Sequence, residues 1–198
     1  MSGRRRLRLG LLPAAVVVVF SVVLAAPPAT AMPVLDQSFT APDDLSGTIN
    51  DGCKYLAQTF TAGVIGMLTG VNVNVISRRD APPLRIAIRD ATNDRPQGPP
   101  LGIRYQTQRR VRLFGRLIGF SERIPVVAGH RYAIQLNYGG AEPTPGVGLG
   151  SWAGGTGNHY LGGRMLAADC PAYGDTRFWH VEDISFDLHF RTFVEPAP

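Results

Sequence analysis

The stretch Ala57–Val75, AQTFTAGVIGMLTGVNVNV, decides the fold class of this chain. Ala57–Thr61 is interpreted as one strand and Leu68–Ile76 as a second, with a glycine-punctuated turn at Gly63, Gly66 and Gly70. Within Val71–Val75 the valines fall on one side and the asparagines on the other, which is the two-residue period of a half-buried strand. The stretch therefore predicts two strands joined by a turn, with the asparagines on the solvent side.

The same alternation recurs along the chain, and no segment shows a sustained 3.6-residue period. The predicted strands cover residues 34–40, 57–61, 68–76, 84–90, 101–106, 117–120, 124–127, 130–138, 147–152, 160–166 and 184–193. Residues 41–52 are rich in Asp, Asn, Pro and Gly and predict a loop. Short strands without helices are typical of an all-β, two-sheet antiparallel sandwich of jelly-roll type with about nine or ten strands. A β-barrel is the alternative architecture.

Two side-chain orientations follow from the alternation. Gln58 lies two residues from Phe60 and should face inward, where its amide can cap backbone groups at a point where strands part. In the closing strand, Phe186, Leu188 and Phe190 should face the core, with the intervening Asp187 and His189 facing solvent.

The first 31 residues have the features of a secretory signal peptide. Four arginines precede an apolar run of about 16 residues, and Ala29-Thr30-Ala31 supplies the small residues of a cleavage site. We expect cleavage after Ala31, since the apolar run is short for a bilayer span; an uncleaved anchor is the alternative. Residues 32–198 then form one exported domain with no transmembrane segment, which we expect to be secreted and monomeric.

The charge of the chain resides mostly in this leader. Of the 20 basic residues four lie in residues 1–31, and none of the 15 acidic residues does, which leaves 16 against 15 in residues 32–198. A net charge near +1 does not favour a nucleic-acid partner.

Cys53 and Cys170 are the two cysteines of the chain. In an exported protein a pair of cysteines predicts one disulfide; two free thiols or a metal pair are the alternatives.

Several segments together resemble a known type of domain. They are Gln58–Gly63 (QTFTAG), Pro83–Arg89 (PLRIAIR), Ala128–Leu136 (AGHRYAIQL) and Phe190–Val194 (FRTFV). The pattern resembles secreted bacterial jelly-roll modules of the galactose-binding-like type, over nearly all of residues 32–198. The resemblance implies the fold, export, and binding of a glycan or a cell-envelope component.

Aromatic and amide residues gather late in the chain, where they could bind a sugar. An exposed ring can stack on the apolar face of a pyranose while amides bond its hydroxyls. The candidate ligand-binding residues are Trp152, Asn158, Tyr160, Tyr173 and Trp179. The alternative is that both tryptophans pack in the core or under loops.

Metal binding and catalysis have less support in the sequence. Asp43, Asp44, Asp51 and Asp183 carry oxygen ligands suited to a structural calcium ion, although their spacing matches no known calcium loop. We expect no other cofactor. Nucleophile-elbow, His-Glu-x-x-His and phosphate-loop motifs do not occur in the sequence, so we expect no enzymatic activity. A glycan-acting hydrolase is the enzymatic alternative.

The sequence thus predicts an exported, non-catalytic module that binds carbohydrate or cell-envelope ligands. A structural or protein-interaction sandwich with all its aromatic residues buried is the alternative. Exposure of Trp152, Tyr173 and Trp179 discriminates between the two.

Overall fold

The computed structural model describes residues 31–40, 45–49, 55–107, 117–138, 149–156, 160–168, 179–181 and 186–198. These residues belong to one compact unit, Ala31–Pro198. The regular secondary structure of these residues consists of β-strands. The strands pair antiparallel in sheets that do not close on themselves. The prediction of an all-β sandwich is confirmed. A membrane-spanning helix is not found in this described part.

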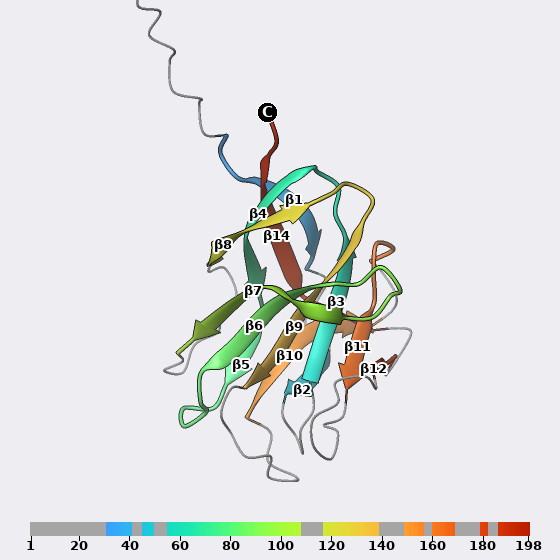
Figure 1. Ribbon diagram of the computed structural model, residues 1–198. Helices are drawn as coiled ribbons and strands as arrows, with labels where there is room; N and C mark the ends of the chain where they lie inside the picture. The colour runs from blue at the N-terminus through green and yellow to red at the C-terminus, as the bar shows by residue number, and fades with distance from the viewer. Residues whose placement is uncertain are drawn as a thin grey trace, which may run out of the picture. The chain divides into compact units, whose positions relative to one another are not determined.

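One layer is a six-stranded sheet in the order β12-β11-β3-β9-β6-β7. Its strands are β12 (Trp179–His180), β11 (Met165–Ala168), β3 (Tyr55–Thr61), β9 (Arg131–Tyr138), β6 (Leu84–Asp90) and β7 (Gln97–Gln106). Figure 1 shows β3, β9 and β6 running side by side across the front of the molecule.

The other layer consists of two four-stranded groups. The first has the order β1-β14-β4-β8, with β1 (Val34–Phe39), β14 (Phe190–Pro196), β4 (Gly66–Val73) and β8 (Ile118–Val126). The second pairs β13 (Phe186–Leu188), β2 (Leu45–Ile49) and β5 (Val75–Ser77) with the central β10 (Gly150–Thr156). In Figure 1, β1, β4 and β14 lie in the upper part of the molecule, and β2, β5 and β10 lie below them.

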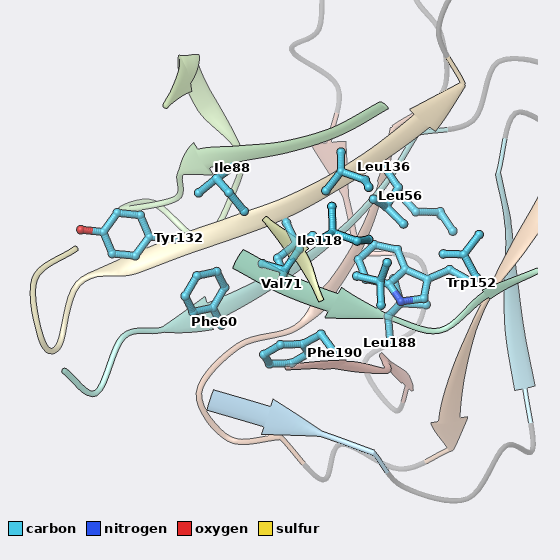
Figure 2. Packing of buried hydrophobic residues seen from close by; sticks show 14 of the residues in the cluster. Leu56, Phe60, Val71, Ile88, Ile118, Tyr132, Leu136, Trp152, Leu188 and Phe190 are labelled. Atoms are coloured by element: carbon cyan, nitrogen blue, oxygen red, sulfur yellow. The ribbon is translucent and has the colours of Figure 1, made fainter. Parts of the chain in front are cut away.

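The core fills the space between the two layers. Leu56, Phe60 and Ile134 from the six-stranded sheet meet Val71 and Phe190 from the opposite layer, and all five are buried. Figure 2 shows this cluster close up. Because burial of apolar surface is the main favourable term in folding, these inward positions explain why the period-2 pattern is strict in the strands that supply them.

Two chain segments pass from one group of the second layer to the other. Asn74 separates β4 from β5, and His189 separates β13 from β14. Both are joined to Ala153 of β10: its N–H donates to the Asn74 carbonyl, and its carbonyl accepts from the His189 N–H, each at 2.8 Å. The asparagine amide and the imidazole Nδ1 of the two residues lie 3.4 Å apart. The second layer therefore bends at one hydrogen-bonded point.

This bend explains where the predicted orientations are wrong. Asp187 and His189 are buried rather than facing solvent, and so are Asn72 and Asn74. The predicted inward residues on either side of the bend are buried as expected, so the two-residue period itself continues. Where the chain changes partners, the residues between them are covered as well. The prediction for Gln58 is confirmed: it is fully buried, and its Oε1 accepts from the Leu188 N–H at 2.8 Å.

Several predicted boundaries also change. Strand β2 lies within the predicted 41–52 loop, because Leu45–Ile49 pairs with β10 despite its turn-forming composition. The glycine-rich residues 153–156 continue β10 instead of ending it. A Cβ on Gly154 would lie 2.2 Å from the Asp187 carbonyl, so close packing of backbones favours glycine there. Two short predicted strands, 117–120 and 124–127, are one strand, β8.

Candidate functional site

The outward side of the six-stranded sheet carries the candidate site. We call the outward-facing residues of β12, β11, β3, β9, β6 and β7 the outer face. Residues paired across an antiparallel ladder share one face, so the register determines which side chains become neighbours. Because Leu56, Ile134 and Ile86 face the core, their sequence neighbours lie on the outer face.

One row across this face combines aromatic rings with polar groups, and we call it the aromatic row. Its members, from β12 to β7, are Trp179, Ala168, Tyr55, Asn137, Arg85 and Tyr105. Tyr55 and Asn137 follow the Leu56–Leu136 pair by one step. Arg85 donates from Nη1 to the Asn137 Oδ1 at 3.2 Å. Tyr105 is 56% exposed at the edge of the sheet, so its ring is accessible.

The next row consists mostly of small side chains, and we call it the floor row. Its members are Leu166, Ala57, Gln135, Ala87 and Ile103. Gln135 is 3% exposed. An amide offers two donors and one carbonyl acceptor, so this side chain can bond a hydroxyl in either direction.

Two arginines flank the floor row on β6. Arg85 and Arg89 are both half-buried and lie on either side of Ala87 along the strand. Arg89 donates from Nη1 to the carbonyl of Gly98. Burial, together with the neighbouring positive charge of Arg85, lowers the pKa of the Arg89 guanidinium. The face therefore holds two cations that the protein itself leaves without a counter-charge in the described region.

A polar loop, residues 91–96, crosses the outer face beyond these rows. Asp94, which has a positive φ of 59°, forms ion pairs with Arg131 of β9 and, at 3.0 Å, with Arg164 just before β11. These contacts carry the loop over β9 and β3, as the green segment in front of β3 shows (Figure 1). The floor-row residues Ala57, Ala87, Gln135 and Leu166 are buried, so the accessible groups of the face are the half-buried Tyr55, Arg85 and Arg89 and the exposed Tyr105.

Asp90 anchors the same loop at the end of β6. Its Oδ1 accepts from the Thr92 N–H at 2.9 Å, the Thr92 hydroxyl at 2.7 Å and the Gln97 amide at 2.7 Å. Its Oδ2 lies 2.7 Å from His130 Nε2. Burial alone would raise the pKa of Asp90, but these hydrogen bonds outweigh it and hold the pKa below its ordinary value.

Asp90→Asn is expected to lower the free energy of unfolding by about 1–2 kcal/mol at neutral pH, because an amide cannot accept all four bonds. Since the native pKa is depressed, the charged form stabilises the fold above pH ~5, and this contribution declines as the pH falls toward and below 4. Urea unfolding should be measured at several pH values from 7 to 3. The difference in free energy of unfolding between wild type and Asp90→Asn should become smaller as the pH falls. The exposed Glu122→Gln serves as the control. A gap that is constant with pH would contradict the role assigned to the carboxylate.

The structure places three of the sequence-predicted binding residues in the interior. Trp152, on β10, is fully buried and donates its indole N–H to the His189 carbonyl at 2.8 Å. Tyr160 donates its hydroxyl to Gln37 Oε1 at 3.0 Å and packs edge-on against Phe190; burial raises its pKa to about 12. Neither ring presents a face for stacking. These two residues support the core, and the assignment of a sugar-stacking role to them is not retained.

Trp179 has a different position. It lies in the aromatic row, but it is 5% exposed and packs with Ala57, Leu166, Ala168 and the half-buried Tyr55. Its ring therefore forms one end of the candidate face and supports Tyr55, while the accessible aromatic surface belongs to Tyr55 and Tyr105.

Other predicted residues lie outside the described residues. They are Asn158, Tyr173, the cysteines Cys53 and Cys170, and the calcium candidates Asp43, Asp44, Asp51 and Asp183. Within the described part, three or more His, Cys, Asp or Glu side chains suited to a metal ion do not come together.

A shallow depression of about 340 Å³ lies over the second layer. It is lined by Thr48, Ile76, Ser77, Arg78, Gly150 and Ser151. Its arginine is already paired with Asp80 at 3.0 Å, and its lining contains no aromatic ring. The outer face of the six-stranded sheet offers the richer set of recognition groups.

The residues of the outer face were partly visible in the sequence. The alternation places Arg85 and Arg89 on the outward side of their strand. Asn137 also alternates with the inward Leu136 and Tyr138, whereas Tyr55 carried no such signal. Both become neighbours of Arg85 only through the strand order β3-β9-β6. Only the strand order shows that Tyr55, Asn137 and Arg85 lie next to one another.

Comparison with known proteins adds no relatives to this picture. No protein-family model matches the sequence, and no curated protein matches it significantly.

Proposed function

We propose that this protein is an exported, non-catalytic carbohydrate-binding module whose site is the outer face. The aromatic row carries the proposal: it sets an accessible tyrosine ring beside an arginine and an amide that are already aligned by a hydrogen bond. Rings stack on the apolar faces of sugars, and preplaced amide and guanidinium groups bond hydroxyls. The site lies on paired strands, so ligand binding costs little ordering entropy.

The non-catalytic part of the proposal rests on how the Asp90 carboxylate is used. Its Oδ1 already accepts three hydrogen bonds from Thr92 and Gln97, and its Oδ2 lies 2.7 Å from His130 Nε2, so both oxygens are engaged within the protein. A general acid or base needs a free position toward its substrate. The Asp90–His130 pair therefore serves as an anchor for the 91–96 loop.

A structural or protein-interaction module with every aromatic residue buried is the alternative. The burial of Trp152 and Trp179 agrees with it, whereas the 56% exposure of Tyr105 within a polar row favours ligand binding. The two proposals make different predictions for a substitution at Tyr105.

Tyr105→Ala is expected to weaken glycan binding by about five- to tenfold, since stacking on an aromatic ring contributes about 1 kcal/mol beyond buried area. Binding of the purified protein to a panel of neutral and acidic oligosaccharides, measured by calorimetry, tests this. The melting temperature should stay unchanged because the ring is exposed.

Ile76→Ala, at an exposed apolar position of the opposite layer, is the matched control and should bind as wild type does. No binding to any member of the panel, or equal affinities of wild type and Tyr105→Ala, would overturn the proposed site.

A further inference from the structure

Resting on the proposed function, we infer that the outer face selects an acidic glycan, one whose sugar carboxylate binds between Arg85 and Arg89. The inference concerns the class of ligand, which stacking and amide groups alone leave open. It depends on three features of the two arginines: their partners, their spacing and an unused donor.

The partners of both arginines are neutral. Arg85 binds the Asn137 amide oxygen, and Arg89 binds the Gly98 carbonyl. Within the described ranges, Arg78, Arg131 and Arg164 form ion pairs with carboxylates. Carboxylates are thus available to this part of the protein, but Asp94 pairs with Arg131 and Arg164 rather than with either arginine of β6.

This arrangement is costly unless an anion joins it. Both guanidinium groups are half-buried, and the two positive charges repel each other across Ala87. A partly desolvated cation without a counter-charge loses solvation that a bound anion restores. A ligand carboxylate would therefore be stabilised here more strongly than on an open surface, where exposed ion pairs contribute little.

The geometry also provides a place and a donor. Residues 85 and 89 face the same way, about 13 Å apart along the strand at ~3.3 Å per residue. Between them Ala87 has no side chain beyond Cβ; it is buried, as is Gln135, which adjoins it in the floor row. The Nε of Arg89 is buried and has no hydrogen-bond partner in the described part of the chain. A planar carboxylate can accept from a guanidinium through two parallel bonds, which a neutral hydroxyl cannot do.

The test compares uronate oligosaccharides with their neutral counterparts of equal length and linkage. Wild type should bind the uronate at least tenfold more tightly, and the difference should shrink as salt rises from 50 to 500 mM, on the scale expected for partly exposed charges. Arg85→Gln/Arg89→Gln should lose this preference, so that the uronate and its neutral counterpart bind with equal affinity. Arg123→Gln, the same change at an exposed position of β8, is the matched control and should leave both affinities unchanged.

Two further measurements keep the inference falsifiable if the double variant does not fold. The uronate, but not its neutral counterpart, should raise the melting temperature of wild type. Arg89→Lys should retain charge but lose part of the preference, because lysine cannot present the paired donors of a guanidinium.

The outcomes separate the two proposals. Equal wild-type affinities for uronate and neutral glycans, or preference for a sulfated glycan alone, would overturn the carboxylate assignment and leave the glycan-binding function standing. Absence of binding to glycans of every class would overturn both.

Discussion

Trp152→Ala is expected to lower the free energy of unfolding by about 3–5 kcal/mol, the range found when a large buried aromatic side chain is removed. The indole is fully buried in the cluster of Figure 2, near Leu56 and Leu188. Its N–H also binds the His189 carbonyl at the bend of the second layer. Removal should therefore loosen the point where β13 passes into β14. Denaturant unfolding monitored by circular dichroism gives the magnitude.

Trp152→Phe separates packing from hydrogen bonding. It retains most of the ring but leaves the His189 carbonyl without the indole donor, so a loss of about 1–3 kcal/mol is expected. Val127→Ala, at a position 55% exposed, should change stability by less than about 0.5 kcal/mol. If Trp152→Ala cost no more than this control, the indole would not be part of the core.

Gln58→Leu should be comparably severe, with an expected loss of about 3–5 kcal/mol, although leucine is similar in size and apolar. Gln58 accepts from the Leu188 N–H and donates to Asp187 Oδ1 at 2.9 Å, both in the interior. Leucine would leave a buried N–H without its acceptor and remove a donor from a carboxylate that is 1% exposed. Unsatisfied buried groups, and buried charges most of all, cost more than the apolar contacts return.

A double-mutant cycle with Asp187→Ala tests the proposed coupling. The two losses should fail to add by at least ~1 kcal/mol, because each substitution removes the same hydrogen bond. Gln106→Leu, the same substitution at the end of edge strand β7, is the control and should have little effect. Additive losses would mean that Gln58 acts through packing alone.

Gln58 also shows what the local sequence pattern can predict and what it cannot. Its position two residues from Phe60 predicts an inward side chain, and the structure confirms it. The identity of its charged partner could not be predicted, since Asp187 is 129 positions away and its alternation points to solvent. Burying a carboxylate costs free energy unless hydrogen-bond donors compensate it. Besides the Gln58 amide, the Tyr160 N–H donates to the Asp187 carboxylate at 3.3 Å.

In the candidate site, too, the sequence predicts the direction of side chains but not their neighbours. Outward alternation predicts which way Arg85 and Arg89 face, but their neighbours depend on β9 lying between β3 and β6. The aromatic residues that seemed suited to stacking were judged by type and by nearness to loops. Burial of Trp152 and Tyr160 depends instead on the opposite layer, which closes over them.

By itself, the sequence determined that the chain forms a β-sandwich and which side chains of most strands face the core. These properties follow from a two-residue period and from the need to bury apolar side chains, and both are local. The tertiary structure alone decided the bend at Asn74 and His189, the burial of Asp187 and the rows of the outer face. Each of these depends on strand order and register between segments far apart in the chain, which local periodicity does not encode.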